Sequence, residues 1–111
     1  RWRDYRTASG RRPVHEFLAG LTDDEVADMV AAMKEVARLG LSAARHLDGE
    51  IYEVRASSDR QTFRILFAKE GQRGQVLLAL DGFSKKQQKL PKRHRDLAKR
   101  RLADWRRRAR E

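Results

Sequence analysis

Apolar residues in the first third of the chain recur at helical spacing. Pro13 suits the first turn of a helix, and the residues after it have the i, i+3, i+4, i+7 spacing of one buried helix face: Val14, Phe17, Leu18 and Leu21. The pattern predicts a short first helix. Before it, Trp2 to Tyr5 reads as the end of a first strand, closed by Ser9-Gly10.

A second helix is predicted directly after the first. Thr22 and Glu25 have the spacing of a capping box, and Gly40 is the residue type that best ends a helix. Between them the apolar positions continue on one face: Val26, Met29, Val30, Met33, Val36 and Ala37. The methionines are interpreted as core residues of this face.

From Ile51 the pattern changes from helical spacing to alternation, which predicts strands. Two alternating runs, IYEVRAS and TFRILFA, are separated by a short polar turn, as in a β-hairpin. Their apolar residues must share one buried face. Arg55 and Arg64 have the opposite parity, so we expect both guanidinium groups on the other, exposed face.

The run from Val76 to Leu80 is apolar without alternation, which is typical of a central strand covered on both faces. It continues into the basic string DGFSKKQQKLPKR. A last helix starting at Pro91 carries apolar residues at spacings of four, three and four: Ala98, Leu102, Trp105 and Ala109. The predicted order is β-α-α-β-β-β-α, an α+β fold in a single domain over residues 1–111.

The net positive charge of the chain is the feature that says most about its binding partners. The 26 Lys and Arg residues exceed the 16 Asp and Glu residues, for a formal net charge of +10. Such a small basic domain is expected to bind a polyanion, with nucleic acid as the first candidate. An acidic membrane surface, an acidic protein partner or a merely solvated basic face would have the same composition.

The composition also excludes several classes of protein. The 111-residue chain has no cysteine, so disulfides, thiolate zinc sites and a cysteine nucleophile are ruled out. It has no apolar run long enough for a membrane span and no signal-peptide pattern, so we expect a soluble, cytoplasmic protein without membrane partners. Because it begins at Arg1 rather than methionine, we also expect a short N-terminal piece to be missing.

Motifs of metal and cofactor chemistry are absent from the sequence. The three histidines, at positions 15, 46 and 94, are scattered and form no HExxH pattern. There is no phosphate-binding glycine loop of the GxxxxGKS or GxGxxG type, and no GxSxG motif. We therefore expect no metal and no small-molecule cofactor. His94 stays open as a functional residue because it follows the basic string.

The remaining candidate functional residues are cationic, and such residues can bind a phosphodiester. Arg55 and Arg64 can clamp phosphate, and lysines after the central strand add compact charge that stabilises a transition state more negative than the ground state. RNA supplies its own nucleophile, the 2′-hydroxyl. The predicted catalytic residues are Arg55, Arg64, Lys85 and Lys86. The predicted RNA-binding residues are Phe83, Gln88, Lys89, Lys92 and Arg93, where Phe83 either stacks on a base or belongs to the core.

Five strings in this order carry a family resemblance: YRTASGRRPVHEFLAGL, ARHLDGEIYEVRAS, FRILFA, LLALDGFSKKQQKLPKR and DLAKRRLADW. With them the chain resembles the RelE/ParE superfamily of toxins from bacterial type II toxin–antitoxin systems, in the HigB-like branch related to phage Gp49 proteins. The resemblance implies a small antiparallel sheet with two helices after the first strand and one at the C-terminus. It also implies a ribosome-dependent endoribonuclease that cuts translated mRNA, an mRNA interferase.

By position, the resemblance assigns phosphate contacts to Arg55 and Arg64 and matches Lys85 and Lys86 to the family's basic pair. It implies a helix-turn-helix antitoxin as partner, besides the ribosome and mRNA. The chain departs from active relatives near its C-terminus, where Trp105 and arginines stand in place of a proton-transferring tyrosine or histidine. Two alternatives remain: a ParE-like inhibitor of DNA gyrase, and a non-catalytic basic module that binds RNA or the ribosome.

Overall fold

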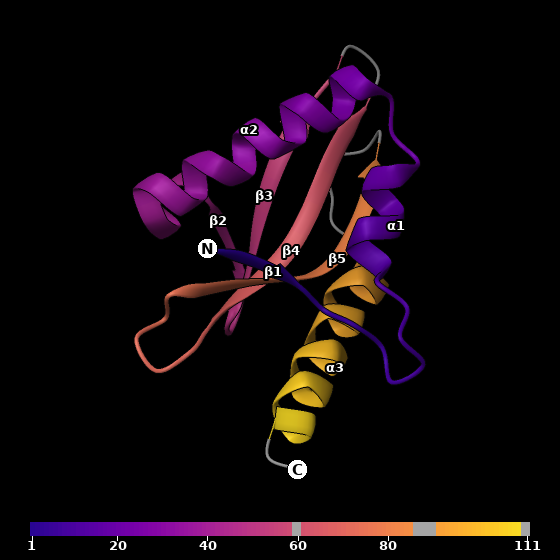
Figure 1. The fold of residues 1–111 in the computed structure, drawn as a ribbon. Helices are drawn as coiled ribbons and strands as arrows, with labels where there is room; N and C mark the ends of the chain where they lie inside the picture. The colour runs from indigo at the N-terminus through magenta and orange to yellow at the C-terminus, as the bar shows by residue number, and fades with distance from the viewer. Residues whose placement is uncertain (59–60, 86–90, 110–111) are drawn as a thin grey trace.

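The computed structural model describes residues 1–58, 61–85 and 91–109. The elements along the chain are β1 (Trp2–Asp4), α1 (Pro13–Ala19), α2 (Asp23–Leu39), a short 3-10 helix (Gly40–Ala43), β2 (Arg45–Asp48), β3 (Ile51–Ser57), β4 (Thr62–Glu70), β5 (Val76–Lys85) and α3 (Lys92–Ala109). Figure 1 shows α2 crossing over the sheet near β3, α1 beside β5, and the chain ending beyond α3. The predicted α+β class with two N-terminal helices and one C-terminal helix is confirmed.

The five strands form one sheet in the order β1-β5-β4-β3-β2. The predicted hairpin of β3 and β4 is confirmed, but two details of the sheet differ from the prediction. β1 pairs with β5 in parallel, so the sheet is mixed rather than antiparallel. β2, sequence RHLD, was not predicted because it is short and lies at the sheet edge next to β3, where Leu47 is its only apolar residue and alternation cannot be recognised.

Each face of the sheet has its own apolar core. On one face, α2 packs against β3 and α1 against β5, around a core that contains the predicted apolar residues Val54, Ile65 and Phe67. On the other face, Leu66, Leu78 and Leu80 pack against Ala98 and Leu102 of α3. β5 lies between these layers, which confirms that the run from Val76 to Leu80 is buried on both sides.

The boundaries of α2 follow the predicted signals. The Thr22 hydroxyl accepts a hydrogen bond from the Glu25 amide at 3.2 Å, and the Glu25 carboxylate accepts one from the Thr22 amide at 2.9 Å. Gly40 follows the helix with φ +78°, a backbone conformation that L side chains rarely adopt. Among the described residues, no helix is long and apolar enough to cross a membrane.

The glycine of the DGFSKK string has a packing role. A Cβ at Gly82 would lie 2.4 Å from Cδ2 of Phe17, closer than real contacts allow. The ring of Phe17 on α1 therefore approaches the backbone of β5 directly at this point. This contact accounts for the glycine between Asp81 and Phe83, whose side chains lie in or next to the site described below.

Candidate active site

Arg55 and Arg64 lie directly opposite each other on β3 and β4, and Phe83 of β5 is the next residue in the same row. Residues opposite one another in a sheet share a face, and this face is the one that α3 covers. The sequence prediction that the two arginines share the face opposite to the apolar residues is confirmed. Figure 1 shows β4 between β3 and β5 at the centre of the sheet.

The carboxylate of Glu53 holds both arginines. Its Oε2 lies 3.2 Å from Nη1 of Arg64, and its Oε1 lies 3.3 Å from Nε of Arg55. The Glu53 side chain has no exposed surface, the Arg64 side chain is 2% exposed, and that of Arg55 is 42% exposed. The expectation that both guanidinium groups are exposed is therefore wrong for Arg64, because the C-terminal helix covers this face of the sheet.

Phe83 is also buried, and its ring stacks on the imidazole of His94. The ring centroids are 3.7 Å apart and the planes differ by 9°. Nδ1 of His94 lies at hydrogen-bond distance, 2.7 Å, from Oδ2 of Asp81. Nη1 of Arg101 lies 3.5 Å from the other oxygen of Asp81 and donates to the Leu80 carbonyl at 2.7 Å. α3 thus places an oriented histidine at the β5 end of the row.

This arrangement places a partly exposed arginine side chain and a carboxylate-bound imidazole on one face of the sheet. Arg55 is exposed enough to contact an anion, while Arg64 and Glu53 lie behind it in the protein. When Nδ1 of His94 donates to Asp81, Nε2 remains available to accept or give a proton, which is the arrangement in which a carboxylate orients a catalytic histidine. The geometry therefore suits acid–base chemistry on the face of the sheet that carries Arg55.

The comparisons with known proteins bear on this site. A family model described as Phage derived protein Gp49-like (DUF891) matches residues 16–103. The chain belongs to this family. The Gp49-like family is a RelE/HigB-like toxin family, so the resemblance inferred from the sequence is confirmed. Membership in this family implies an antitoxin as partner. No curated protein matches the chain.

Other residues predicted for the site of this Gp49-like protein lie in different situations. Lys85 is the last residue of β5, and its Cα pairs with that of Thr62, two positions before Arg64 on β4. Lys92 and Arg93 are exposed at the start of α3, next to His94. The remaining predicted residues lie outside the described part of the chain: Lys86, Gln88 and Lys89.

Sequence reasoning missed three residues of the Gp49-like site, namely Glu53, Asp81 and Arg101. Glu53 had a usable signal, because it has the same parity as Arg55 two positions away. Asp81 had none. The register of β4 and β5 shifts between Leu66 and Phe67, which pair with Asp81 and Ala79, and this irregularity breaks strict alternation along β5. Arg101 is hidden among the many arginines of α3.

Proposed function

We propose that this Gp49-like protein is the toxin of a type II toxin–antitoxin system and cleaves mRNA on the translating ribosome. In this proposal it acts in the cytoplasm as an endoribonuclease that needs no metal, with the RNA 2′-hydroxyl as nucleophile. The observation that carries the proposal is the row of Arg55, Arg64 and the stacked Phe83–His94 pair across three adjacent strands. It joins a phosphate-binding group to an oriented proton carrier on one face of the sheet.

Arg55 is the proposed phosphate contact. Its side chain is partly exposed, and its Nε forms an ion pair with Glu53. The transition state of RNA cleavage carries more negative charge than the ground state, so a fixed guanidinium stabilises it selectively. From their place in the sequence after the apolar part of β5, we expect Lys85, Lys86 and Lys89 to add positive charge toward the RNA and Gln88, Lys92 and Arg93 to contact its backbone.

His94 is the proposed general acid or base. Asp81 orients the ring, and Phe83 covers one of its faces. The position of His94 at the start of α3 compensates for the absence of a proton-transferring tyrosine or histidine near the C-terminus. Asp81 acts as a positioning residue in this scheme, because its contact is with the imidazole rather than with the reacting atoms.

Arg64 is a positioning residue as well, although the sequence predicted a catalytic one. Its side chain is buried, and it holds Glu53, which in turn anchors Arg55. A buried guanidinium paired with a buried carboxylate fixes the angle at which Arg55 leaves the sheet. Phe83 likewise supports His94 rather than stacking on a splayed base.

The test is cleavage in a translating extract, with new 5′ ends of the mRNA mapped by primer extension. The wild-type protein is expected to generate new ends that disappear when translation is blocked. Arg55→Ala and His94→Gln are each expected to lower the cleavage rate by about 100-fold or more, the usual effect of losing a general acid–base or charge-stabilising group.

The matched control is Arg73→Ala. Arg73 is an exposed arginine in the turn between β4 and β5, beyond the end of β4 that lies away from Arg64, and its replacement removes the same charge. The control is expected to cleave like the wild type. Intact mRNA in every reaction would overturn the proposal. Inhibition of gyrase supercoiling together with intact mRNA would instead identify the alternative, a gyrase inhibitor.

A further inference from the structure

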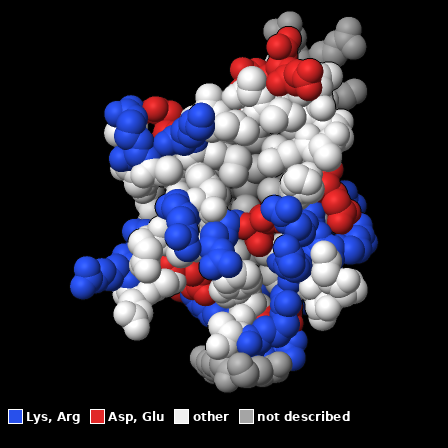
Figure 2. Space-filling model, in the orientation of Figure 1, with Lys and Arg blue, Asp and Glu red and all other residues white. Residues whose placement is uncertain are grey.

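A second basic region lies on the outer side of β1, away from the candidate active site. Here a cleft of about 590 Å³ runs between β1, the segment after it and the end of α3. Its lining is rich in arginine and contains both tryptophans of the chain: Trp2, Arg3, Asp4, Arg6, Arg12, Trp105 and Arg108. Figure 2 shows Lys and Arg gathered over the half of this face where β1 and α3 lie. We call it the β1-edge cleft.

Only part of the positive charge in the β1-edge cleft is neutralised. Arg12 binds the Asp4 carboxylate with two hydrogen bonds of 2.9 and 2.8 Å, and Arg108 binds Asp104 at 2.9 Å. Arg3 and Arg6 are exposed, and neither forms an ion pair with another described residue. Arg3 lies over the ring of Trp105, 5.6 Å from its centroid. The cleft therefore retains two guanidinium groups for a negatively charged ligand.

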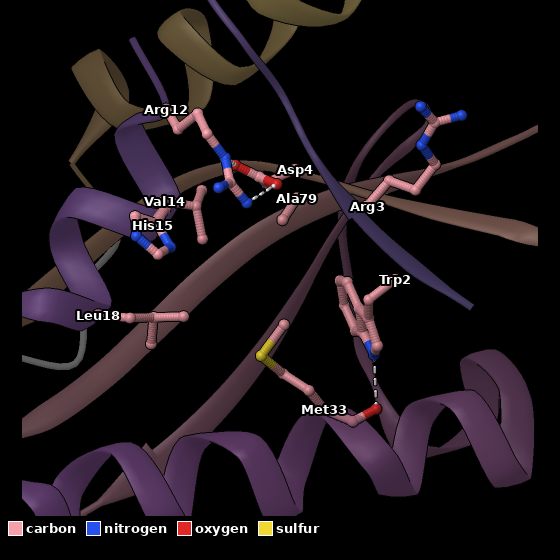
Figure 3. A pocket seen from close by; sticks show the side chains of 9 residues that line it. All are labelled: Trp2, Arg3, Asp4, Arg12, Val14, His15, Leu18, Met33 and Ala79. Carbon is pink, nitrogen blue, oxygen red and sulfur yellow. Dashed lines mark hydrogen bonds and ion pairs between the residues drawn. The ribbon is translucent and has the colours of Figure 1, made fainter.

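An apolar cavity of about 150 Å³ adjoins the cleft and shares four of its residues. Figure 3 shows Val14, Leu18 and Met33 around it, while Arg3 extends to the other side of β1. Trp2 donates its indole N–H to the Met33 carbonyl at 2.7 Å, which fixes one wall. A cavity of this volume accommodates a group as large as a benzene ring. It is therefore large enough for one apolar side chain.

β1 is also an edge strand, and its hydrogen bonds to β5 use alternate residues. The Arg1 carbonyl accepts from Leu77, and the Tyr5 amide donates to Ala79. In a parallel ladder the residues between them face the other way, so the backbone groups of Trp2 and Asp4 point toward the open edge. An unpaired strand edge is a template for an added strand.

These observations together describe one ligand. We propose that the β1-edge cleft binds an extended acidic segment of a partner protein, with one apolar side chain in the adjoining cavity. Side chains alternate along a strand, so acidic residues on either side of the apolar one would face Arg3 and Arg6. Nucleic acid would also satisfy the arginines, but it has no aliphatic side chain for the cavity and no backbone amides for the strand edge.

The β1-edge cleft is independent of the candidate active site. None of its seven lining residues falls within residues 16–103, the part matched by the family model. None belongs to the Arg55–Arg64–Phe83 row either, because β1 contacts the earlier part of β5, from Leu77 to Ala79. Binding at this cleft can therefore be measured, and can fail, without reference to RNA cleavage.

Intrinsic tryptophan fluorescence provides the test, because the only two tryptophans of the chain line the cleft. The probe is a short acetylated peptide with a central leucine flanked on each side by glutamate. We expect a saturable fluorescence change at low salt that weakens as salt is added. Replacing the leucine of the peptide by alanine is expected to weaken binding about tenfold, from the loss of buried apolar surface.

The decisive variant is Arg6→Glu, which reverses an exposed charge of the cleft and is expected to weaken peptide binding about tenfold. Arg45→Glu is its control, since it makes the same charge change on β2 at the opposite edge of the sheet. Equal effects of the two variants would overturn the proposal. So would the absence of any fluorescence change, or a single-stranded oligoribonucleotide that binds more tightly than the peptide and loses affinity in Arg6→Glu.

Discussion

Arginine side chains lie in opposite electrostatic environments in two regions of this protein. In the Arg55–Arg64–Phe83 row, Arg64 is buried under α3 and is paired with the equally buried Glu53. In the β1-edge cleft, Arg3 and Arg6 are exposed and form no ion pair with other described residues. The residue type is the same, but its environment differs.

The difference follows from the cost of removing a charge from water. A buried guanidinium requires a carboxylate, since desolvation of an unpaired ion costs several kcal/mol. An exposed guanidinium needs no internal partner, because water and salt screen it. Arg64 is therefore committed to holding the structure in place, whereas Arg55 is partly exposed. Arg3 and Arg6 of the cleft remain available to another molecule.

The largest loss of stability is expected when the buried Glu53–Arg64 pair is broken. Glu53→Ala leaves the Arg64 guanidinium without its carboxylate, and we expect the free energy of unfolding to fall by about 3–5 kcal/mol. Urea denaturation followed by circular dichroism measures it. The double variant Glu53→Met with Arg64→Met removes both charges and should recover most of this loss. A single variant as stable as the wild type would contradict the importance of the pair.

A smaller loss of stability is expected at Tyr5, whose hydroxyl connects the end of β1 to α3. The buried Tyr5 donates its hydroxyl to Asp104 at 2.5 Å and so ties the end of β1 to α3. Tyr5→Phe should lower the free energy of unfolding by about 1–2 kcal/mol, from the loss of a hydrogen bond to a charged group. Tyr52→Phe, which alters the other tyrosine, is the control and should change stability by less than about 0.5 kcal/mol.

Acid should weaken the β1 edge. A hydrogen bond from Arg12 lowers the pKa of Asp4 below its usual 3.8, and a hydrogen bond from Tyr5 does the same for Asp104. A carboxyl group whose pKa is lower in the folded protein contributes stability above pH 3.8, and this contribution is lost as the pH falls through the folded-state pKa. The temperature of the thermal unfolding midpoint should therefore fall when the pH is lowered below about 4.

The variant that sharpens this prediction combines Asp4→Asn and Asp104→Asn. With both titrating groups removed, the unfolding midpoint should be lower at neutral pH and should depend less steeply on pH in the acid range. Thermal unfolding at a series of pH values provides the comparison. A slope identical to that of the wild type would assign the acid sensitivity to other carboxylates, among them Asp48 and Glu50, whose pKa values are also lowered by basic partners on α3.

The smallest effect is expected at the exposed arginines of the cleft. Arg6 is exposed and forms no ion pair with another described residue, so Arg6→Ala should change the free energy of unfolding by less than about 0.5 kcal/mol. Urea denaturation under the conditions used for Glu53→Ala tests the contrast between the two regions. A loss as large as that of Glu53→Ala would show that Arg6 is committed to the fold and would remove the distinction.

Local signals in the sequence were sufficient for much of the fold. The capping box and Gly40 predicted the ends of α2, and alternation predicted that Arg55 and Arg64 share a face of the β3–β4 hairpin. Each of these features depends on residues a few positions apart, whose geometry is set by helical or strand periodicity. The edge strand β2 was missed because a four-residue strand with one apolar residue, Leu47, is too short to show alternation.

Alternation along a strand determines which side chains share a face, but not what covers that face. Whether Arg64 is exposed was decided by α3, which begins 28 positions later in the chain. The position of Asp81 was decided by a register irregularity between β4 and β5, and the β1-edge cleft by contact between Arg6 and Arg108, 102 positions apart. Such contacts arise only when distant segments pack together, because burial and charge compensation depend on the complete fold.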